Sequence, residues 1–444
     1  MTQTASSGTR HVHSEATIRR NIGWSALNHF FVEGGMTLSD PATVLPLLIR
    51  ELGGSHAVAG LVPSVRLFGW LLPQFFVAAP MQRLKRFLPT VRALEAVRTL
   101  VYLLLALLLV HHDRTNPGLF LTVVFVLFII ARLAAGSSAV ARSELVARMV
   151  PAGQRSRVVS MRSFTGDIGG FTAGILIGYV LSAEGLAFPV NYAWLLGISG
   201  LSFLLAISAL SMVVEPKGAP LGTRVDLWQQ LKRAPDLLRQ DQRFLRYIEA
   251  RAATAAVGIA DPFFILYATE VLGVSPAMSG VYLSARMLVR LFSNLLWART
   301  TRVRGNLWTF RVARLLGAVE PLAVLLFGLL ARGIWGSEVP VIVGALFAVP
   351  FSLQGLAISA DNISRTSYLY DIAPDQERPT YIGLSNTLLG PLQFLPTLGG
   401  LLVQAIGFPP IFVLATLCAL WSYFLSRDMD GAEKPEGGAR IQAR

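Results

Sequence analysis

Acidic and basic residues that could exchange protons or hold an anion lie within long apolar stretches of this sequence. Gly53 marks a turn, 13 residues after Asp40 and 13 residues before Arg66. Two antiparallel helices that leave a short turn place equidistant residues at the same depth, at about 1.5 Å per residue. We therefore expect Asp40 and Arg66 to pair, and Asp261 and Arg286 to repeat this pair in the second half of the chain.

These two pairs have a functional and a structural reading. A charged side chain in the middle of a membrane costs roughly 2.5–3.5 kcal/mol on insertion scales, so each one needs a partner. In the functional reading the pairs open and re-form as a gate, with Asp40 as a proton acceptor. In the structural reading Asp40 and Asp261 cap helix segments that begin at the following prolines, and the arginines neutralise them permanently.

A second group of polar residues is confined to the first half. His29, Glu33 and Asp40 are spaced by four and seven residues, so they share one face of a helix. The second half has Ala250 and Thr254 at the first two of these places. Because burial favours the protonated carboxyl group, a carboxylate near an imidazole could bind a proton. In the alternative reading His29 and Glu33 lie near the end of the helix and are hydrated.

Arg132 and Asp167 are also unmatched in the second half, where glycines stand at the corresponding places. Each lies about ten residues inside its helix, so the two could pair. Alternatively, Arg132 points into a central cavity, where it holds an anionic substrate group or pairs with Glu33. Gln354 adds an uncharged hydrogen-bonding group, and Arg290 follows Arg286 by one turn and could join the same network.

The composition places these residues in a membrane protein. The 444 residues are 53% hydrophobic and only 15% charged, with a mean hydropathy of +0.55, whereas soluble domains carry about a quarter charged residues. A spanning helix needs about 20 mostly apolar residues. This criterion predicts about twelve helices, at 21–49, 57–79, 90–110, 118–140, 159–181, 192–214, 247–270, 277–298, 308–331, 340–360, 381–406 and 411–426.

The net charge of +13 has a topological explanation. Lysine and arginine collect in alternate loops and in the long linker, whereas the other loops hold little beyond Arg50, Arg114 and Arg332. The positive-inside rule then places both termini in the cytoplasm, and no nucleic-acid partner is needed to explain the charge.

The single cysteine and the absence of a zinc-binding histidine pattern predict no metal site, and no phosphate-binding loop motif occurs.

The two halves of the sequence repeat each other. Leu52-Gly53 and Ser64-Val65-Arg66 match Leu272-Gly273 and Ser284-Ala285-Arg286 at a constant offset of 220 residues. Two sets of six spans in the same orientation, joined by a basic linker, form a parallel repeat.

This layout resembles the major facilitator superfamily over essentially the whole chain. Arg132-x-x-x-Gly136, the loop from Pro151 to Arg155 and the glycines from Gly166 to Gly178 are similar to the family's fourth and fifth helices. The family's loop signature is degenerate here, because the segment from Ala78 to Arg86 lacks both of its glycines and its aspartate. Segments around Asp40-Pro41 and Trp70 resemble a bacterial subgroup of the family.

The sequence therefore predicts an all-α polytopic membrane protein built from two pseudo-symmetric six-helix bundles. The expected parts are a cytoplasmic tail (1–20), a bundle (21–214), a cytoplasmic linker with an amphipathic helix (215–246), a second bundle (247–426) and a cytoplasmic tail (427–444). The resemblance implies that spans one, four, seven and ten line a central cavity.

The expected function is secondary active transport, not enzyme catalysis. Such a monomer would move a small organic molecule across the cell membrane by alternating access, driven by protons and without a cofactor. The alternatives are a non-transporting sensor or scaffold with the same fold, and a membrane-embedded enzyme that modifies lipid. The enzyme would need a cluster of catalytic groups near one membrane interface, which the sequence does not show.

Overall fold

The computed structural model describes residues 14–81, 84–111, 116–182, 186–216, 235, 237–336, 339–374 and 377–429. The first half contains α2 (Glu15–Leu38), α3 (Val44–Glu51), α4 (His56–Met81), α5 (Leu88–Val110), α6 (Pro117–Met149), α7 (Arg155–Ser182) and α8 (Val190–Ser211). The second half contains α10 (Gln242–Val257), α11 (Asp261–Glu270), α12 (Met278–Arg304), α13 (Asn306–Trp335), α14 (Val341–Leu346), α15 (Ala348–Ile372), α16 (Arg378–Leu389), α17 (Leu395–Ile406) and α18 (Pro409–Arg427).

Each of the twelve predicted spans coincides with one of these helices or with two consecutive ones. Within the described residues, nine segments are long and apolar enough to cross a membrane by themselves. Two helices that are not among these nine, α2 and α12, carry Glu33, Arg286 and Arg290 within their length. Most of the predicted amphipathic linker helix lies outside the described residues, as do Gln82 and Arg83 of the degenerate loop.

The first and seventh spans are each broken at an Asp-Pro step. In the first, α2 ends at Leu38 and α3 begins at Val44, and the backbone between them is held by Asp40. The Asp40 carboxylate accepts hydrogen bonds from the Ala42 backbone N–H (3.0 Å) and the Thr43 hydroxyl (2.9 Å). Asp40 therefore stabilises the turn itself, because α3 starts three residues too late for Asp40 to be its N-cap.

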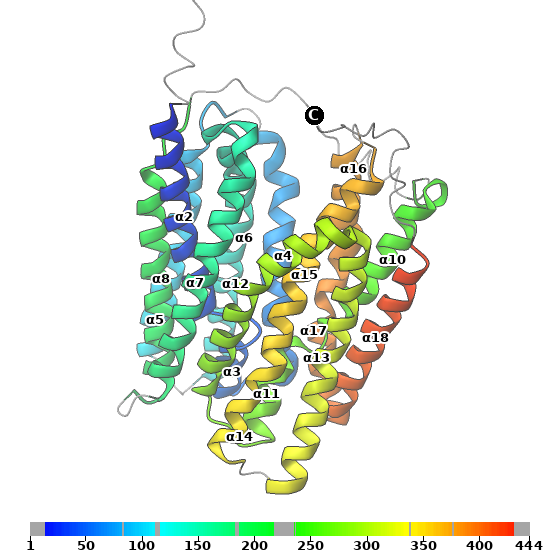
Figure 1. The fold of residues 1–444 in the computed structure, drawn as a ribbon. Helices are drawn as coiled ribbons and strands as arrows, with labels where there is room; N and C mark the ends of the chain where they lie inside the picture. Colours follow the sequence, from blue (N-terminus) through cyan, green and yellow to red (C-terminus); the bar gives the residue numbers. More distant parts are fainter. Residues whose placement is uncertain are drawn as a thin grey trace, which may run out of the picture.

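The molecule has two ends, which we name by the residues they contain. The turn face holds the tight turns at Gly53 and Gly273, and the linker face holds Glu15, Ser211 and Gln242, where α2 and α10 begin and α8 ends. In Figure 1 the turn face is at the bottom and the linker face at the top. The halves contact each other chiefly through two helix pairs, α7 with α12 and α4 with α17.

Glycines allow α7 and α12 to approach closely near the turn face. A Cβ atom added to Gly174 would come within 2.7 Å of the Ser284 backbone nitrogen and 2.9 Å of the Gly280 oxygen. The face of small residues predicted from the sequence therefore packs against the other half at this point, as such faces do between membrane helices.

Replacing Gly174 with alanine is expected to force α7 and α12 apart and to open the turn face. Overpacking of this kind costs about 1–3 kcal/mol. Labelling of a cysteine at the buried, cross-half position Ser64 by a membrane-impermeant maleimide, in a Cys418→Ser background, should accelerate. Gly178→Ala in the same helix is the matched control, because its added Cβ would come no closer than 3.5 Å to any neighbour. Equal labelling in the two variants would show that this contact does not hold the face closed.

Candidate substrate cavity

A central cavity separates the two halves from mid-depth toward the linker face. Its first-half part has a volume of about 470 Å³ and its second-half part about 430 Å³, and Arg66 and Leu67 line both parts. The first-half part extends to the exposed Ser143, near the linker-face end of α6. Volumes of this size suit a small-molecule ligand.

The opposite end of the cavity is closed by contacts between the halves. At the turn face the Arg50 guanidinium lies 2.6 Å from the Glu270 carboxylate, and the Ser64 and Thr397 hydroxyl oxygens lie 3.0 Å apart. Among the residues that the structure describes, every hydrogen bond and ion pair that joins the halves lies between mid-depth and this face. The cavity is thus open toward the linker face and closed toward the turn face.

Asp40 is held across the interface by the second half. The Arg286 guanidinium donates to the Asp40 carboxylate at 2.7 Å and to the Gln354 side-chain oxygen at 3.1 Å. Asp40 and Arg286 are both buried. These two contacts therefore join the break between α2 and α3 to α12 and α15 at the closed end of the cavity.

Arg290, one turn further along α12, joins two carboxylates of the first half. Its guanidinium lies 2.6 Å from the Glu33 carboxylate and 2.5 Å from the Asp167 carboxylate. Asn294 donates a further hydrogen bond to Asp167 at 2.9 Å. Because Arg286, Arg290 and Asn294 follow each other at four-residue spacing, one face of α12 supplies all these contacts.

The predicted pairs within each half are therefore wrong, although the predicted depth is right. Asp40 pairs with Arg286 instead of Arg66, and Asp261 is not paired with Arg286. Within the described residues, neither Arg66 nor Asp261 has an oppositely charged side chain within 4 Å, and both line the second-half part of the cavity. The physical reason is that Arg286 faces the other bundle and finds a carboxylate at the same depth across the interface, whereas Arg66 faces the cavity.

The pairing of Arg132 with Asp167 is also wrong, because Asp167 binds Arg290 and Asn294. Arg132 instead lines the first-half part of the cavity, near the hydroxyl group of Tyr102. This agrees with the alternative prediction that Arg132 points into a central cavity. The Glu33 carboxylate, predicted to lie near His29, forms its ion pair with Arg290, while His29 lines the first-half part of the cavity.

The first-half part of the cavity is strongly basic. Five arginines and one carboxylate line it: Arg66, Arg98, Arg132, Arg142, Arg162 and Glu95. The buried Glu95 carboxylate forms ion pairs with Arg98 (2.5 Å) and Arg142, and it accepts a hydrogen bond from Ser138 at 2.5 Å. One carboxylate therefore compensates two of the five cations.

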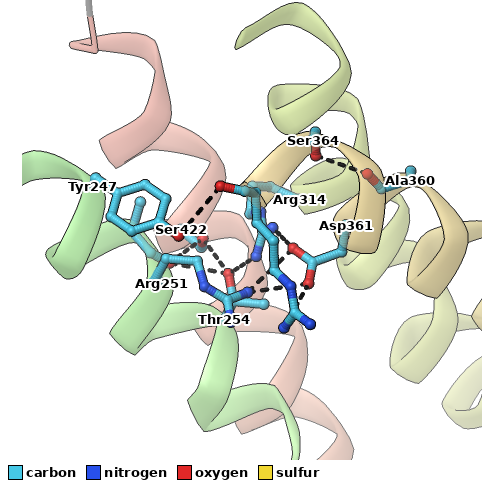
Figure 2. A network of polar contacts seen from close by, with 10 residues as sticks. Tyr247, Arg251, Thr254, Arg314, Ala360, Asp361, Ser364 and Ser422 are labelled. Atoms are coloured by element: carbon cyan, nitrogen blue, oxygen red, sulfur yellow. Dashed lines mark hydrogen bonds and ion pairs between the residues drawn. The ribbon is translucent and has the colours of Figure 1, made fainter. Parts of the chain in front are cut away.

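A second charged cluster lies in the other half of the molecule (Figure 2). The Asp361 carboxylate of α15 forms ion pairs with Arg314 of α13 and with Arg251 of α10, the latter at 3.1 Å. Arg314 also donates to the Thr254 hydroxyl, which lies 2.8 Å from the Ser422 hydroxyl. The cluster joins four helices of the second half beside the cavity.

The sequence reasoning missed these two clusters. Glu95 and Arg98 are spaced by three residues within an apolar span, which is itself a signal of an ion pair inside a helix. Arg142 was excluded because the predicted span ended at residue 140, whereas α6 continues to Met149. Asp361 was missed for the same reason, since the tenth span was ended at residue 360.

The comparisons with known proteins agree with this architecture. A profile described as Major Facilitator Superfamily matches residues 26–353. No curated protein matches the sequence.

Solved structures that cover nearly the whole chain share its fold. A D-xylose–proton symporter superposes with a TM-score of 0.68 at 14% identity, over 94% of this chain and 98% of that chain. The nucleoside transporter NupG gives a TM-score of 0.68 at 12% identity, over 93% and 99% of the two chains. A POT family transporter in complex with 5-aminolevulinic acid gives 0.68 at 11% identity, over 92% and 98%.

These superpositions establish the common fold, and the family profile covers the chain from within α2 to within α15. The chain belongs to the major facilitator superfamily.

Proposed function

We propose that this protein is a secondary active transporter that carries a small organic molecule across the cell membrane by alternating access. The observation that supports this proposal is the central cavity, which is open toward the linker face and closed at the other end by contacts between the halves. A rocking movement of the two bundles would close the cavity at the linker face and open it at the turn face. The cavity lies within a single chain, so a monomer is sufficient for transport.

The proposed orientation places the linker face in the cytoplasm. Arg148, Arg155 and Arg302 lie at this end of the described helices, and the sequence that connects α8 to α10 is basic. Positively charged segments are retained on the cytoplasmic side of bacterial and eukaryotic membranes alike. The structure then corresponds to a state that opens to the cytoplasm.

Asp261 is the carboxylate that we propose for proton coupling. It lines the cavity beside the buried carboxyl group of Glu320, and it has no cation within 4 Å among the described residues. Asp40, by contrast, is neutralised by Arg286. A protonated Asp261 would leave Arg66 free, whereas an ionised Asp261 would attract Arg66 across the interface, so proton binding would alter how the halves approach each other.

Asp261→Asn is expected to abolish accumulation driven by an imposed proton gradient and to preserve exchange of substrate down its own gradient. The neutral amide keeps the shape of the side chain but removes the proton-binding charge. Both activities are measured in proteoliposomes, with substrates identified from a panel of labelled organic anions, sugars, nucleosides and peptides.

Asp371→Asn is the control, because Asp371 is exposed and lies outside the cavity. Gradient-driven accumulation by Asp261→Asn at the rate of this control would refute the coupling role. If no compound moves in either direction although one stabilises the folded protein, the non-transporting sensor replaces the transporter.

A further inference from the structure

The first-half part of the cavity holds three arginines that form no ion pair with a described carboxylate. Among the described residues, no acidic side chain lies within 4 Å of Arg66, Arg132 or Arg162. Glu95, the one carboxylate lining this part, is occupied by Arg98 and Arg142. The local excess of positive charge is therefore built into the cavity wall.

Arg132 is the most deeply buried of the three. The residue is 5% exposed, and its Nε–H has no hydrogen-bond partner among the residues that the structure describes. The neighbouring Tyr102 side chain offers a hydroxyl group but no carboxylate. A buried guanidinium without a counter-charge is costly, and a bound anion that accepts hydrogen bonds from it would remove that cost.

The excess of positive charge is confined to the first-half part of the cavity and is not found in the second-half part. There, four arginines (Arg66, Arg251, Arg314 and Arg365) share the wall with three carboxyl groups (Asp261, Glu320 and Asp361), so positive and negative groups are nearly balanced. The first-half part also has apolar lining from Val32, Met36 and Leu67. Its chemistry suits a ligand with both an anionic group and an apolar or uncharged body.

We propose that Arg66, Arg132 and Arg162 form the binding site for the anionic group, a carboxylate or phosphate, of a small organic anion that is the transported substrate. This inference rests on the proposed transport function. Guanidinium groups bind both of these oxyanions through paired hydrogen bonds, so they provide charge and orientation together.

The charge of the cavity is tested first with cysteine reagents of opposite sign. In the full-length Cys418→Ser protein, Ala139→Cys reports on the first-half part and Ala255→Cys on the balanced second-half part. The rates of modification by an anionic sulfonate and a cationic trimethylammonium methanethiosulfonate are compared. We expect the anionic-to-cationic rate ratio to be about tenfold or more higher at Ala139→Cys than at Ala255→Cys. Equal ratios at the two positions would overturn the proposal.

Binding is tested in the same protein with citrate and inorganic phosphate as probes. At least one of them should slow modification of Ala139→Cys in a saturable manner, and Arg132→Gln should weaken that protection about tenfold or more. Arg132→Lys, which keeps the charge, should retain part of it. Arg302→Gln removes an equal charge at an exposed position outside the cavity and should leave the protection unchanged. Absence of protection by both probes, or protection that Arg132→Gln leaves unchanged, would overturn the proposal.

Transport measurements separate this inference from the function on which it rests. If a neutral or cationic solute is carried and Arg132→Gln carries it at the unmodified rate, the anion site is refuted while the transporter stands. If citrate or phosphate binds through Arg132 and no solute is ever carried, the anion site stands while the transporter is refuted.

Discussion

Replacing Arg290 with glutamine is expected to open the turn face and to lower the transport rate about 100-fold. Arg290 is the cation that joins Glu33 of α2 and Asp167 of α7 to the second half. Without it, two carboxylates face each other at the closed end of the cavity, and the Asp167 side chain is only 2% exposed. Removing one partner from a buried ion pair costs about 3–5 kcal/mol.

This free energy acts on the closure of the turn face, because the ion pairs exist only while the halves are in contact. A change of about 3 kcal/mol corresponds to a factor of more than 100 in an equilibrium constant, since each 1.36 kcal/mol is tenfold. Labelling of a cysteine at Ser64, in the Cys418→Ser background, should therefore become much faster in Arg290→Gln. The same proteoliposomes give the transport rate.

Arg290→Lys is the matched variant for this experiment. Lysine keeps the positive charge, but as a point charge it does not reproduce the planar fork that contacts both carboxylates. We expect an intermediate labelling rate and partial transport. Wild-type labelling and transport in Arg290→Gln would show that this ion-pair network does not control closure.

Replacing Asp361 with asparagine is expected to produce the largest loss of stability in the second half. Asp361 is the carboxylate that compensates Arg251 and Arg314, and the Arg314 side chain is 1% exposed. Asparagine preserves the size of the side chain but leaves these guanidinium groups to repel each other in a buried site. The free energy of unfolding should fall by about 3–5 kcal/mol.

The effect is measured as the midpoint of thermal unfolding in detergent, followed by tryptophan fluorescence. Asp361→Glu keeps the charge and should lose less stability, whereas the exposed Asp371→Asn should lose almost none. Arg314→Met combined with Asp361→Asn removes one of the repelling cations and should recover part of the loss. An unfolding midpoint of Asp361→Asn equal to that of the unmodified protein would contradict the structural role of the cluster.

The number of spans, the breaks in the first and seventh spans and the depth of the central charges were predictable from the sequence, whereas the breaks in the tenth and eleventh spans were not. Apolar length decides the spans, the Asp-Pro steps at Asp40 and Asp261 mark the breaks, and the constant rise per residue sets the depth. Each of these features depends only on the residues of one chain segment, so it can be predicted without knowing how the segments are arranged around the cavity.

The partners of the charged residues were not predictable in this way. Asp40 and Arg66 lie at the same depth, but Arg286 lies at that depth too, and only the packing of the two halves decides between them. Charged residues near the predicted helix ends were not recognised as cavity residues for a different reason. Helices such as α6 continue well beyond the bilayer-length apolar run, so Arg142 reaches the cavity from a segment that hydropathy alone assigns to a loop.

The central claim, alternating access of a cavity between two moving halves, is tested most directly by locking the turn face. Ser64 of α4 and Thr397 of α17 come from opposite halves, and their hydroxyl oxygens lie 3.0 Å apart. With cysteines at both positions in the Cys418→Ser protein, oxidation should join the halves, stop transport of every substrate found in the proteoliposome panel, and be reversed by a reductant. Undiminished transport through the oxidised, cross-linked protein would contradict the account.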